Sequence, residues 1–357
     1  MKKYKIAIDV SPIYDGNSLR GIGHFTSKLI ESMKTELKNN SDFNNFRVDF
    51  VTNKSSGRYD LIHYPFFDPF KLTLPNKSDI PTIVTVYDLI PRQFRKFFPV
   101  GLRGEINWQL QKNRLKKADY IITCSHYSKY VISDLTGYPQ DQIYVTYAAA
   151  DDSFKPINNK ILLKKIKDKY KLPNKFILYV GDINWNKNIP SLLKACRKLN
   201  YPLVIVGSAA TQKNVPDHPW TKDLRYLQSE HQKQSNQGCL VLTGFVPDED
   251  LPVIYNLATV YCQPSYAEGF GIPLVQAMKS GCPVAYSLET SLPEVMDFNG
   301  EFFNPYSQRE IQSALSKLWN NKKLRQQYTK DGLKRAQVFD WQLTALSTLS
   351  VYQLALQ

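Results

Sequence analysis

The chain has 357 residues, 43% of them apolar and 22% charged, a globular composition that excludes wholesale disorder and a low-complexity protein. This length predicts two domains, and the longest uncharged runs, residues 251–267 and 341–357, are too polar to predict a membrane-spanning helix. The formal net charge is +14, and in the first half of the chain the excess lies in residues 92–117, which points to an anionic surface or ligand.

Short β-branched runs alternate with helical stretches through the first half. The apolar spacing of Phe25, Leu29, Ile30, Met33 and Leu37 predicts one helix between the first two strands. The strands themselves are predicted at residues 5–10, 47–51, 60–64, 82–87, 120–124 and 142–147. Nearly continuous apolar strands separated by helices indicate a buried parallel sheet.

The same rhythm restarts in the second half. Strands are predicted at residues 176–180, 203–206, 240–243, 259–262 and 283–286. Helices are predicted at residues 189–199 and 248–257 and after Gly271.

This pattern predicts an α/β protein of two consecutive Rossmann-like, doubly wound domains. The boundaries are expected at 1–155 for the first domain and 156–338 for the second. A C-terminal helix, 339–357, is expected to pack back on the first domain. Ligands of such sheets bind beyond the carboxyl ends of the strands, so we expect the active site in the cleft between the domains.

The segment from Gln263 to Gly281 carries the most information. A strand ends near Gln263, a glycine-bearing loop follows, and Pro273 and Gly281 mark the start and end of a helix. The helix start offers backbone N–H groups and a positive dipole end to a phosphate. A carboxylate beside a phosphate is unfavourable unless it binds another group, so Glu268 indicates a ligand with further groups such as sugar hydroxyls. The alternative is an ordinary strand–turn–helix corner with an acid at the helix start.

Residues 264–273 resemble the signature of the GT-B glycosyltransferases of family four, which are retaining nucleotide-sugar enzymes. Their pattern is Pro-Ser-x-x-Glu-Gly-Phe-Gly-x-Pro, with a second Glu eight positions after the first. Further matching pieces follow in family order over almost the whole chain: 20–23, 60–63, 84–89, 118–125, 178–181, 187–188, 242–251, 281–284 and 291–295. The order and spacing of these pieces together make the resemblance specific.

The resemblance implies roles for the matching residues. Glu268 would contact the transferred sugar and Lys187 the diphosphate, so these are the expected catalytic residues. The expected donor-binding residues are Gly21, Gly23, Gly181, Gly207, Gly244, Val246, Ser265, Tyr266, Gly269, Phe270, Gly271, Gln276 and Glu294. The expected acceptor-side residues are His63, Tyr87 and Asp88. For Gly21 and Gly23 the alternative is a flexible corner, and for His63 it is a core imidazole with satisfied hydrogen bonds.

The chain departs from the family pattern at four positions. Gln276 stands where the second acid would hold the ribose, and an amide is not a charged acceptor. Asp182 and Asn186 stand where relatives often place an arginine, so the diphosphate loses one expected cation. Tyr87 replaces a histidine and is a poor base near neutral pH.

Residues 92–117 hold eight basic side chains against Glu105 alone. Phe94, Phe97, Phe98 and Trp108 interleave with them. This combination favours docking on an anionic membrane surface, with aromatic rings at the lipid interface. A solvated helix face is the alternative. Nucleic acid is not expected as a partner, because no helix-turn-helix, RRM or KH signature accompanies the charge.

Two features bear on the cellular compartment. Asp9 interrupts any signal-peptide core near the N-terminus. The five cysteines are odd in number and lack CxxC spacing, which predicts reduced core thiols and neither disulfides nor a zinc site. We therefore expect a cytoplasmic protein, peripheral to the inner face of the membrane if the basic segment docks there.

The resemblance implies a retaining hexosyltransferase that uses a nucleotide diphosphate sugar, with GDP-mannose favoured. The acceptor would be a hydroxyl of a glycan or lipid-linked molecule in cell-surface polysaccharide assembly. No cofactor or obligatory metal is expected, because Lys187 and the helix start would stabilise the leaving diphosphate. The alternatives are a sugar-nucleotide epimerase and a catalytically degenerate GT-B scaffold bound to anionic membrane.

Overall fold

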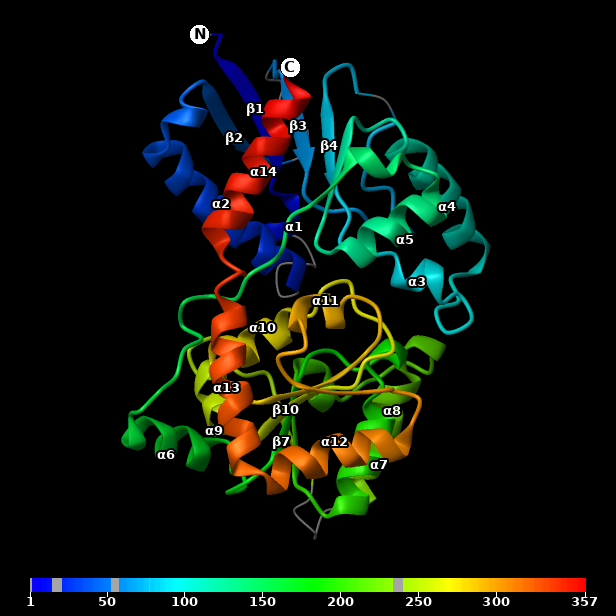
Figure 1. Ribbon diagram of the computed structural model, residues 1–357. Helices are drawn as coiled ribbons and strands as arrows, with labels where there is room; N and C mark the ends of the chain where they lie inside the picture. The colour runs from blue at the N-terminus through cyan, green and yellow to red at the C-terminus, as the bar shows by residue number, and fades with distance from the viewer. Residues whose placement is uncertain (1, 15–20, 53–57, 77, 234–239) are drawn as a thin grey trace. The chain divides into compact units, whose positions relative to one another are not determined.

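The computed structural model describes residues 2–14, 21–52, 58–76, 78–233 and 240–357 (Figure 1). The chain forms two compact units, Met1–Ala149 with Phe339–Gln357, and Ala150–Val338. The first unit thus ends at Ala149, before the expected boundary at 155, and it includes the C-terminal segment from Phe339.

The first unit is built on a six-stranded parallel sheet with strand order β2-β1-β3-β4-β5-β6. Its strands are β1 (Tyr4–Asp9), β2 (Phe46–Val51), β3 (Leu61–Tyr64), β4 (Thr82–Thr85), β5 (Tyr120–Thr123) and β6 (Ile143–Val145). Its helices are α1 (Ser11–Tyr14), α2 (Gly21–Asn39), α3 (Ile90–Gln93), α4 (Gly101–Leu115), α5 (His126–Thr136) and α14 (Trp341–Ala355). Helix α14, drawn in red in Figure 1, packs against α2 and touches β4 and β5.

The second unit repeats the design with strand order β12-β11-β10-β7-β8-β9, again all parallel. Its strands are β7 (Ile177–Val180), β8 (Leu203–Val206), β9 (Leu240–Gly244), β10 (Val260–Gln263), β11 (Val284–Ser287) and β12 (Glu301–Phe303). Its helices are α6 (Lys160–Lys169), α7 (Ile189–Leu199), α8 (Lys222–Lys233), α9 (Leu251–Leu257), α10 (Ile272–Lys279), α11 (Leu292–Met296), α12 (Gln308–Asn320) and α13 (Lys322–Ala336). The predicted architecture of two doubly wound units is confirmed.

The differences from prediction lie mainly at the ends of elements. Strand β4 stops at Thr85, and Val86, which the prediction counted as strand, is fully buried in the loop that follows. Helix α9 begins at Leu251, so Pro252 sits in its first turn, where no backbone N–H is needed. Strand β12 was not predicted, since it has three residues and pairs with β11 alone.

Candidate functional site

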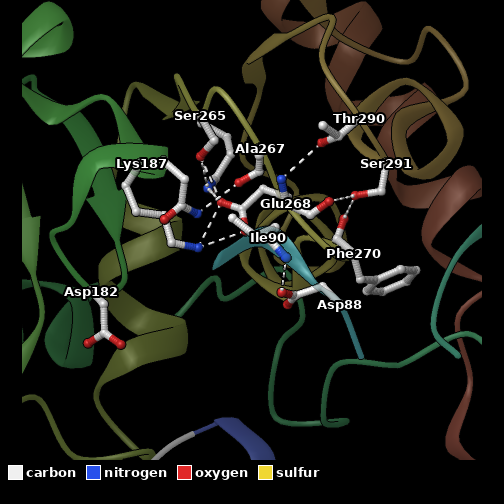
Figure 2. Close-up of polar contacts among 12 residues, drawn as sticks. Asp88, Ile90, Asp182, Lys187, Ser265, Ala267, Glu268, Phe270, Thr290 and Ser291 are labelled. Carbon is white, nitrogen blue, oxygen red and sulfur yellow. Dashed lines mark hydrogen bonds and ion pairs between the residues drawn. The ribbon is translucent and has the colours of Figure 1, made fainter. Parts of the chain in front are cut away.

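The candidate site of the second unit lies at the carboxyl ends of β7 and β10, which are neighbours in the sheet. The chain leaves β7 through a short 3₁₀ turn, Trp185–Lys187, and leaves β10 through the loop that carries Glu268. The Nζ atom of Lys187 lies 2.7 Å from Oε2 and 2.9 Å from Oε1 of Glu268 (Figure 2). The two expected catalytic residues therefore form an ion pair with each other.

The Glu268 carboxylate has further donors. Gln263 Nε2 donates to Oε1 over 2.6 Å, and Ser265 Oγ donates to the same oxygen over 2.7 Å. The side chain of Glu268 is only 8% exposed, against 21% for Lys187. Three side-chain donors on one carboxylate fix its orientation. Such a group is suited to accepting hydrogen bonds from hydroxyls.

The main chain around Glu268 is held by the loop that follows β11. The amide of Glu268 donates to Thr290 Oγ1 over 2.9 Å. Ser291 Oγ donates to the carbonyls of Glu268 and Phe270, over 2.9 and 3.1 Å (Figure 2). The loops after β7, β10 and β11 thus all help to hold Glu268. The loop after β11 also leads into α11, which carries Glu294.

Two asparagines join the Lys187 turn to the Glu268 loop. Asn186 Nδ2 donates to the Ala267 carbonyl over 2.9 Å, and the Tyr266 amide donates back to the Asn186 carbonyl over 2.8 Å. Asn188 Nδ2 donates to the carbonyls of Pro264 and Pro305. Asn186, which stands where relatives often carry a cation, is buried and acts here as a brace between the loops.

The ring of Tyr266 lies in an aromatic stack. Trp185 covers one face at a centroid distance of 5.1 Å, and Tyr306 stacks on Tyr266 at 4.8 Å. Because both neighbours stack on its ring, Tyr266 can offer a donor its edge and hydroxyl but not a face. Of the donor-binding residues expected in this loop, Ser265 is bonded to Glu268 and Phe270 is buried.

Helix α10 starts as predicted, directly after Gly269 and Gly271. Gly271 adopts φ +102°, and an added Cβ would lie 3.0 Å from Leu292 Cδ2. Only glycine fits this position without strain. Helix α10 thus starts at Ile272, shortly after Glu268 in the chain, and its first backbone N–H groups are of the kind that bind an anion at a helix N-terminus.

The remaining expected glycines follow the sheet order. Gly181, Gly207 and Gly244 stand at the carboxyl ends of β7, β8 and β9, which are adjacent strands. An added Cβ on Gly207 would lie 2.4 Å from the Gly181 carbonyl oxygen, so these two loops touch through their backbones. Val246, shortly after Gly244, is buried.

Gln276 lies in the second turn of α10. Its Oε1 accepts a hydrogen bond from the Tyr255 hydroxyl over 3.0 Å. Tyr255 is fully buried, and burial raises the pKa of its hydroxyl well above the usual range, so this hydroxyl is a permanent donor. The amide oxygen of Gln276 is engaged, and its NH₂ group is the end that faces away from Tyr255.

His63, expected on the acceptor side or as a core imidazole, has the surroundings of the core alternative. His63 is fully buried, with Nδ1 2.6 Å from the Tyr352 hydroxyl and Nε2 2.8 Å from Thr85 Oγ1. Burial lowers the pKa of His63 to about 3. The imidazole is a neutral link between α14 and the sheet.

The other residues expected in the first unit have local contacts. Tyr87 meets Phe25 edge-on at 5.1 Å, and burial raises the pKa of its hydroxyl. Asp88 Oδ1 accepts from the Ile90 amide at the start of α3. Gly21 and Gly23 lie in the first turn of α2, while Arg20 lies outside the described residues. The ligand roles of these four residues stay predictions.

The basic segment 92–117 has some of its side chains in the core and others on the surface. Arg92 is buried, pairs with Glu105 at 2.8 Å and lies over the ring of Trp108. Trp108 and Phe98 are buried as well, so the expectation that they contact lipid is wrong. Trp108 lies on the buried face of α4, and Phe98 is buried in the segment before that helix.

An apolar stripe is exposed on α4 instead. Leu102, Ile106 and Leu110 are 79%, 52% and 42% exposed, and their spacing of four places them on one side of the helix. Arg103, Lys116 and Lys117 are exposed nearby in the chain. Among the described helices, none has the length and apolarity to cross a membrane.

The part of the chain that the structure describes holds neither a group of metal ligands nor a disulfide. No three His, Cys, Asp or Glu side chains there are grouped to hold a metal ion. The four described cysteines are buried and form no disulfide, and Cys239 lies outside the described residues.

Several residues of the site were not predicted. Gln263, Thr290 and Tyr255 contact Glu268 or Gln276, yet none belongs to the expected set. One signal was available for Gln263, because it is a polar residue at the end of an otherwise apolar strand. Thr290 and Tyr255 carry no such signal, since their contacts depend on packing between elements.

Family models match both halves of the chain. Residues 163–335 match the model described as glycosyl transferases group 1, and residues 33–154 match glycosyltransferase family 4. The chain is 32% identical over 247 residues to O-antigen chain mannosyltransferase B from Escherichia coli, covering 67% of this chain and 62% of that protein. It is 28% identical over 291 residues to the serotype-specific mannosyltransferase WbdA from Escherichia coli, covering 78% of this chain and 34% of that protein. The chain thus spans less than two thirds of the length of these relatives.

Solved structures share the fold over nearly the full length. Sucrose-phosphate synthase from Thermosynechococcus elongatus superposes with a TM-score of 0.76 at 18% identity, over 99% of both chains. Anabaena Alr3699/HepE in complex with UDP-glucose gives a TM-score of 0.72 at 16% identity, over 98% of this chain and 99% of that one.

Proposed function

Because the chain belongs to the family-four glycosyltransferases of GT-B fold, we propose that it transfers a hexose from a nucleotide diphosphate sugar to a hydroxyl group. The acceptor is a glycan or a lipid-linked molecule, and the anomeric configuration is retained. The observation that carries this proposal is the joint placement of Lys187, Glu268 and the start of α10 at neighbouring strand ends. The names of the similar mannosyltransferases support mannose as the hexose and O-antigen-type polysaccharide as the product class, and we propose GDP-mannose as the donor to test first.

In the proposed reaction, the bond between the anomeric carbon and the diphosphate breaks while negative charge builds on the leaving group. Lys187 and the N-terminus of α10 supply positive potential to that charge. Glu268 accepts hydrogen bonds from the sugar hydroxyls and fixes the anomeric carbon.

The donors around Glu268 also bear on stereochemistry. Gln263 and Ser265 both donate to Oε1 of its carboxylate, which makes it a poor nucleophile. We therefore propose that the acceptor hydroxyl attacks on the face that the diphosphate leaves. The leaving diphosphate then takes the acceptor proton, and no glycosyl-enzyme intermediate forms.

The test is a transfer assay with GDP-mannose and UDP-glucose, with a mannose-terminated oligosaccharide as acceptor. The proposal expects an α-linked product from an α-linked donor, read by NMR, and loss of transfer in Glu268→Gln. An inverted product would refute retention. Nucleotide binding without transfer or hydrolysis would favour a degenerate scaffold, and a changed free sugar nucleotide would favour an epimerase.

A second proposal concerns the exposed stripe on α4, defined by Leu102, Ile106 and Leu110. We propose that this stripe docks on an anionic bilayer, with the leucine and isoleucine side chains at the acyl boundary. Exposed basic residues nearby complement anionic head groups, and each contributes about 1 kcal/mol near such a surface. The test is co-sedimentation with vesicles that contain or lack phosphatidylserine.

The design needs two variants. Glutamine at all three stripe positions should reduce binding to anionic vesicles at least about tenfold, since three apolar side chains leave the interface. Lys164→Gln with Lys165→Gln, on α6 of the other unit, is the control for lost charge and should bind like the wild type. Equal loss in both variants, or equal binding to neutral vesicles, would contradict a specific docking surface.

A further inference from the structure

The ion pair between Lys187 and Glu268 joins two groups that the proposed function assigns to different parts of the donor. Lys187 is assigned to the diphosphate and Glu268 to the sugar. In the structure each is bound to the other, with both carboxylate oxygens within 2.9 Å of Nζ. An arriving diphosphate must therefore compete with Glu268 for the ammonium group.

The two partners are held very differently. Glu268 keeps two other side-chain donors, Gln263 Nε2 and Ser265 Oγ, both buried. Lys187 is the more exposed partner and sits on a stem with four rotatable bonds. If the pair opens, Lys187 is the side chain that moves and Glu268 is the one that stays.

The orientation of Gln263 is itself fixed. The hydroxyl of Tyr261, which is fully buried, donates to Gln263 Oε1, so the amide turns its NH₂ group toward Glu268. The same NH₂ group also donates to Ser265 Oγ over 2.9 Å. If Lys187 moves away, Glu268 loses the hydrogen bonds from Nζ but keeps the one from Gln263, whose orientation Tyr261 fixes.

We propose that the Lys187–Glu268 pair is a latch that the diphosphate opens. The latch rests on the proposed function. When the diphosphate binds, Lys187 turns from Glu268 to the phosphate oxygens. The released carboxylate oxygens of Glu268 then accept hydrogen bonds from the sugar hydroxyls. Gln263 is the positioning residue that holds Glu268 in place during the exchange. The movement of Lys187 frees its ammonium group for the diphosphate and the Glu268 carboxylate for the sugar. Binding of the diphosphate and binding of the sugar are thereby coupled.

The latch predicts opposite effects from two neighbouring substitutions. Glu268→Gln removes the competitor for Lys187 and should tighten binding of a diphosphate. Gln263→Met removes a donor from Glu268, so Glu268 binds Lys187 more strongly. This variant should therefore bind a diphosphate more weakly. A general loss of structure would weaken binding in both variants, so the opposite signs separate the latch from damage.

The test is calorimetric titration of the full chain with inorganic pyrophosphate. We expect about tenfold tighter binding by Glu268→Gln and about three- to tenfold weaker binding by Gln263→Met, the range of one hydrogen bond to a charged group. The control is Asp168→Asn, which removes an exposed charge on α6 of the same unit, outside the expected donor-binding set. Its binding should change by less than about twofold.

Three outcomes would overturn the latch. These are Glu268→Gln binding within twofold of the wild type or more weakly, Gln263→Met binding more tightly, and no variant binding pyrophosphate. If Glu268→Gln does not fold, Glu268→Ala takes its place, because it also removes the competitor for Lys187 and should bind pyrophosphate more tightly. Pyrophosphate binding needs no sugar transfer, so a chain that shows the pattern without transfer keeps the latch and refutes the proposed function. A chain that transfers sugar but lacks these opposite effects on pyrophosphate binding keeps the proposed function and refutes the latch.

Discussion

Replacing Gln276 by glutamate restores the acid that relatives carry at this position, and its effect on donor binding can be reasoned from the surroundings. The Tyr255 hydroxyl donates to Gln276 Oε1 over 3.0 Å, and burial raises the pKa of this hydroxyl well above its usual range. A carboxylate at this position would keep that donor on one oxygen and offer the other to a ribose hydroxyl. Gln276→Glu therefore adds a charged acceptor without orphaning Tyr255.

The expected size of the effect follows from two opposing contributions. A charged acceptor is roughly twice as strong as a neutral one, which favours the variant by about 1–1.5 kcal/mol. Desolvation of the carboxylate and repulsion from the diphosphate oppose it, and the helix N-terminus offsets part of that repulsion. We expect a net gain of about 1 kcal/mol, or about fivefold tighter binding.

The assay is titration of wild type and Gln276→Glu with GDP-mannose and with GDP. The gain should appear for both ligands, because both contain the ribose. Tyr255→Phe is the matched control: without the hydroxyl, the new carboxylate lacks its donor and the gain from Gln276→Glu should shrink or change sign. More than tenfold weaker binding by a folded Gln276→Glu would show that the amide itself contacts the ribose, and would refute this reasoning.

Three other predictions concern stability and metal dependence. The unfolded chain protonates His63 near pH 6.5 whereas the folded chain does so only near pH 3, so stability should fall by about 1.4 kcal/mol per pH unit as the pH drops between these values. His63→Gln should flatten that slope in chemical denaturation, and an unchanged slope would contradict a neutral buried imidazole. Gly207→Ala should lower the free energy of unfolding by about 1–3 kcal/mol, because its Cβ would lie 2.4 Å from the Gly181 carbonyl; an unchanged midpoint would refute that contact. Glycosyl transfer should survive a chelator, because Lys187 and the start of α10 carry the positive charge; loss that magnesium restores would overturn this.

Much of the candidate site could be predicted because it depends on local sequence. The loop between Gln263 and Gly281 needs particular backbone angles, and glycine and proline mark them directly, as at Gly271 and Pro273. The neighbouring positions of Lys187 and Glu268 follow from strand order, because parallel strands present their carboxyl ends at one edge.

Other parts of the structure depend on contacts between distant residues. His63 is a core residue because Tyr352, 289 positions later, binds its ring, and no local pattern shows this. On α4 the apolar residues form two faces, one with Trp108 and Leu115 and the other with Leu102 and Ile106. Sequence periodicity finds both faces but cannot decide which one is buried.

The central claim is that the site formed by Lys187 and Glu268 binds a nucleotide diphosphate sugar. The most direct measurement is the thermal shift of the wild type and Lys187→Met over a panel of GDP- and UDP-sugars. At 100 times its dissociation constant, a ligand adds about 2.7 kcal/mol of stability, which a melting curve resolves. The account predicts a clear shift of the wild type by at least one nucleotide sugar and its loss in Lys187→Met. An equal shift in both proteins, or none with any nucleotide sugar, would contradict the claim.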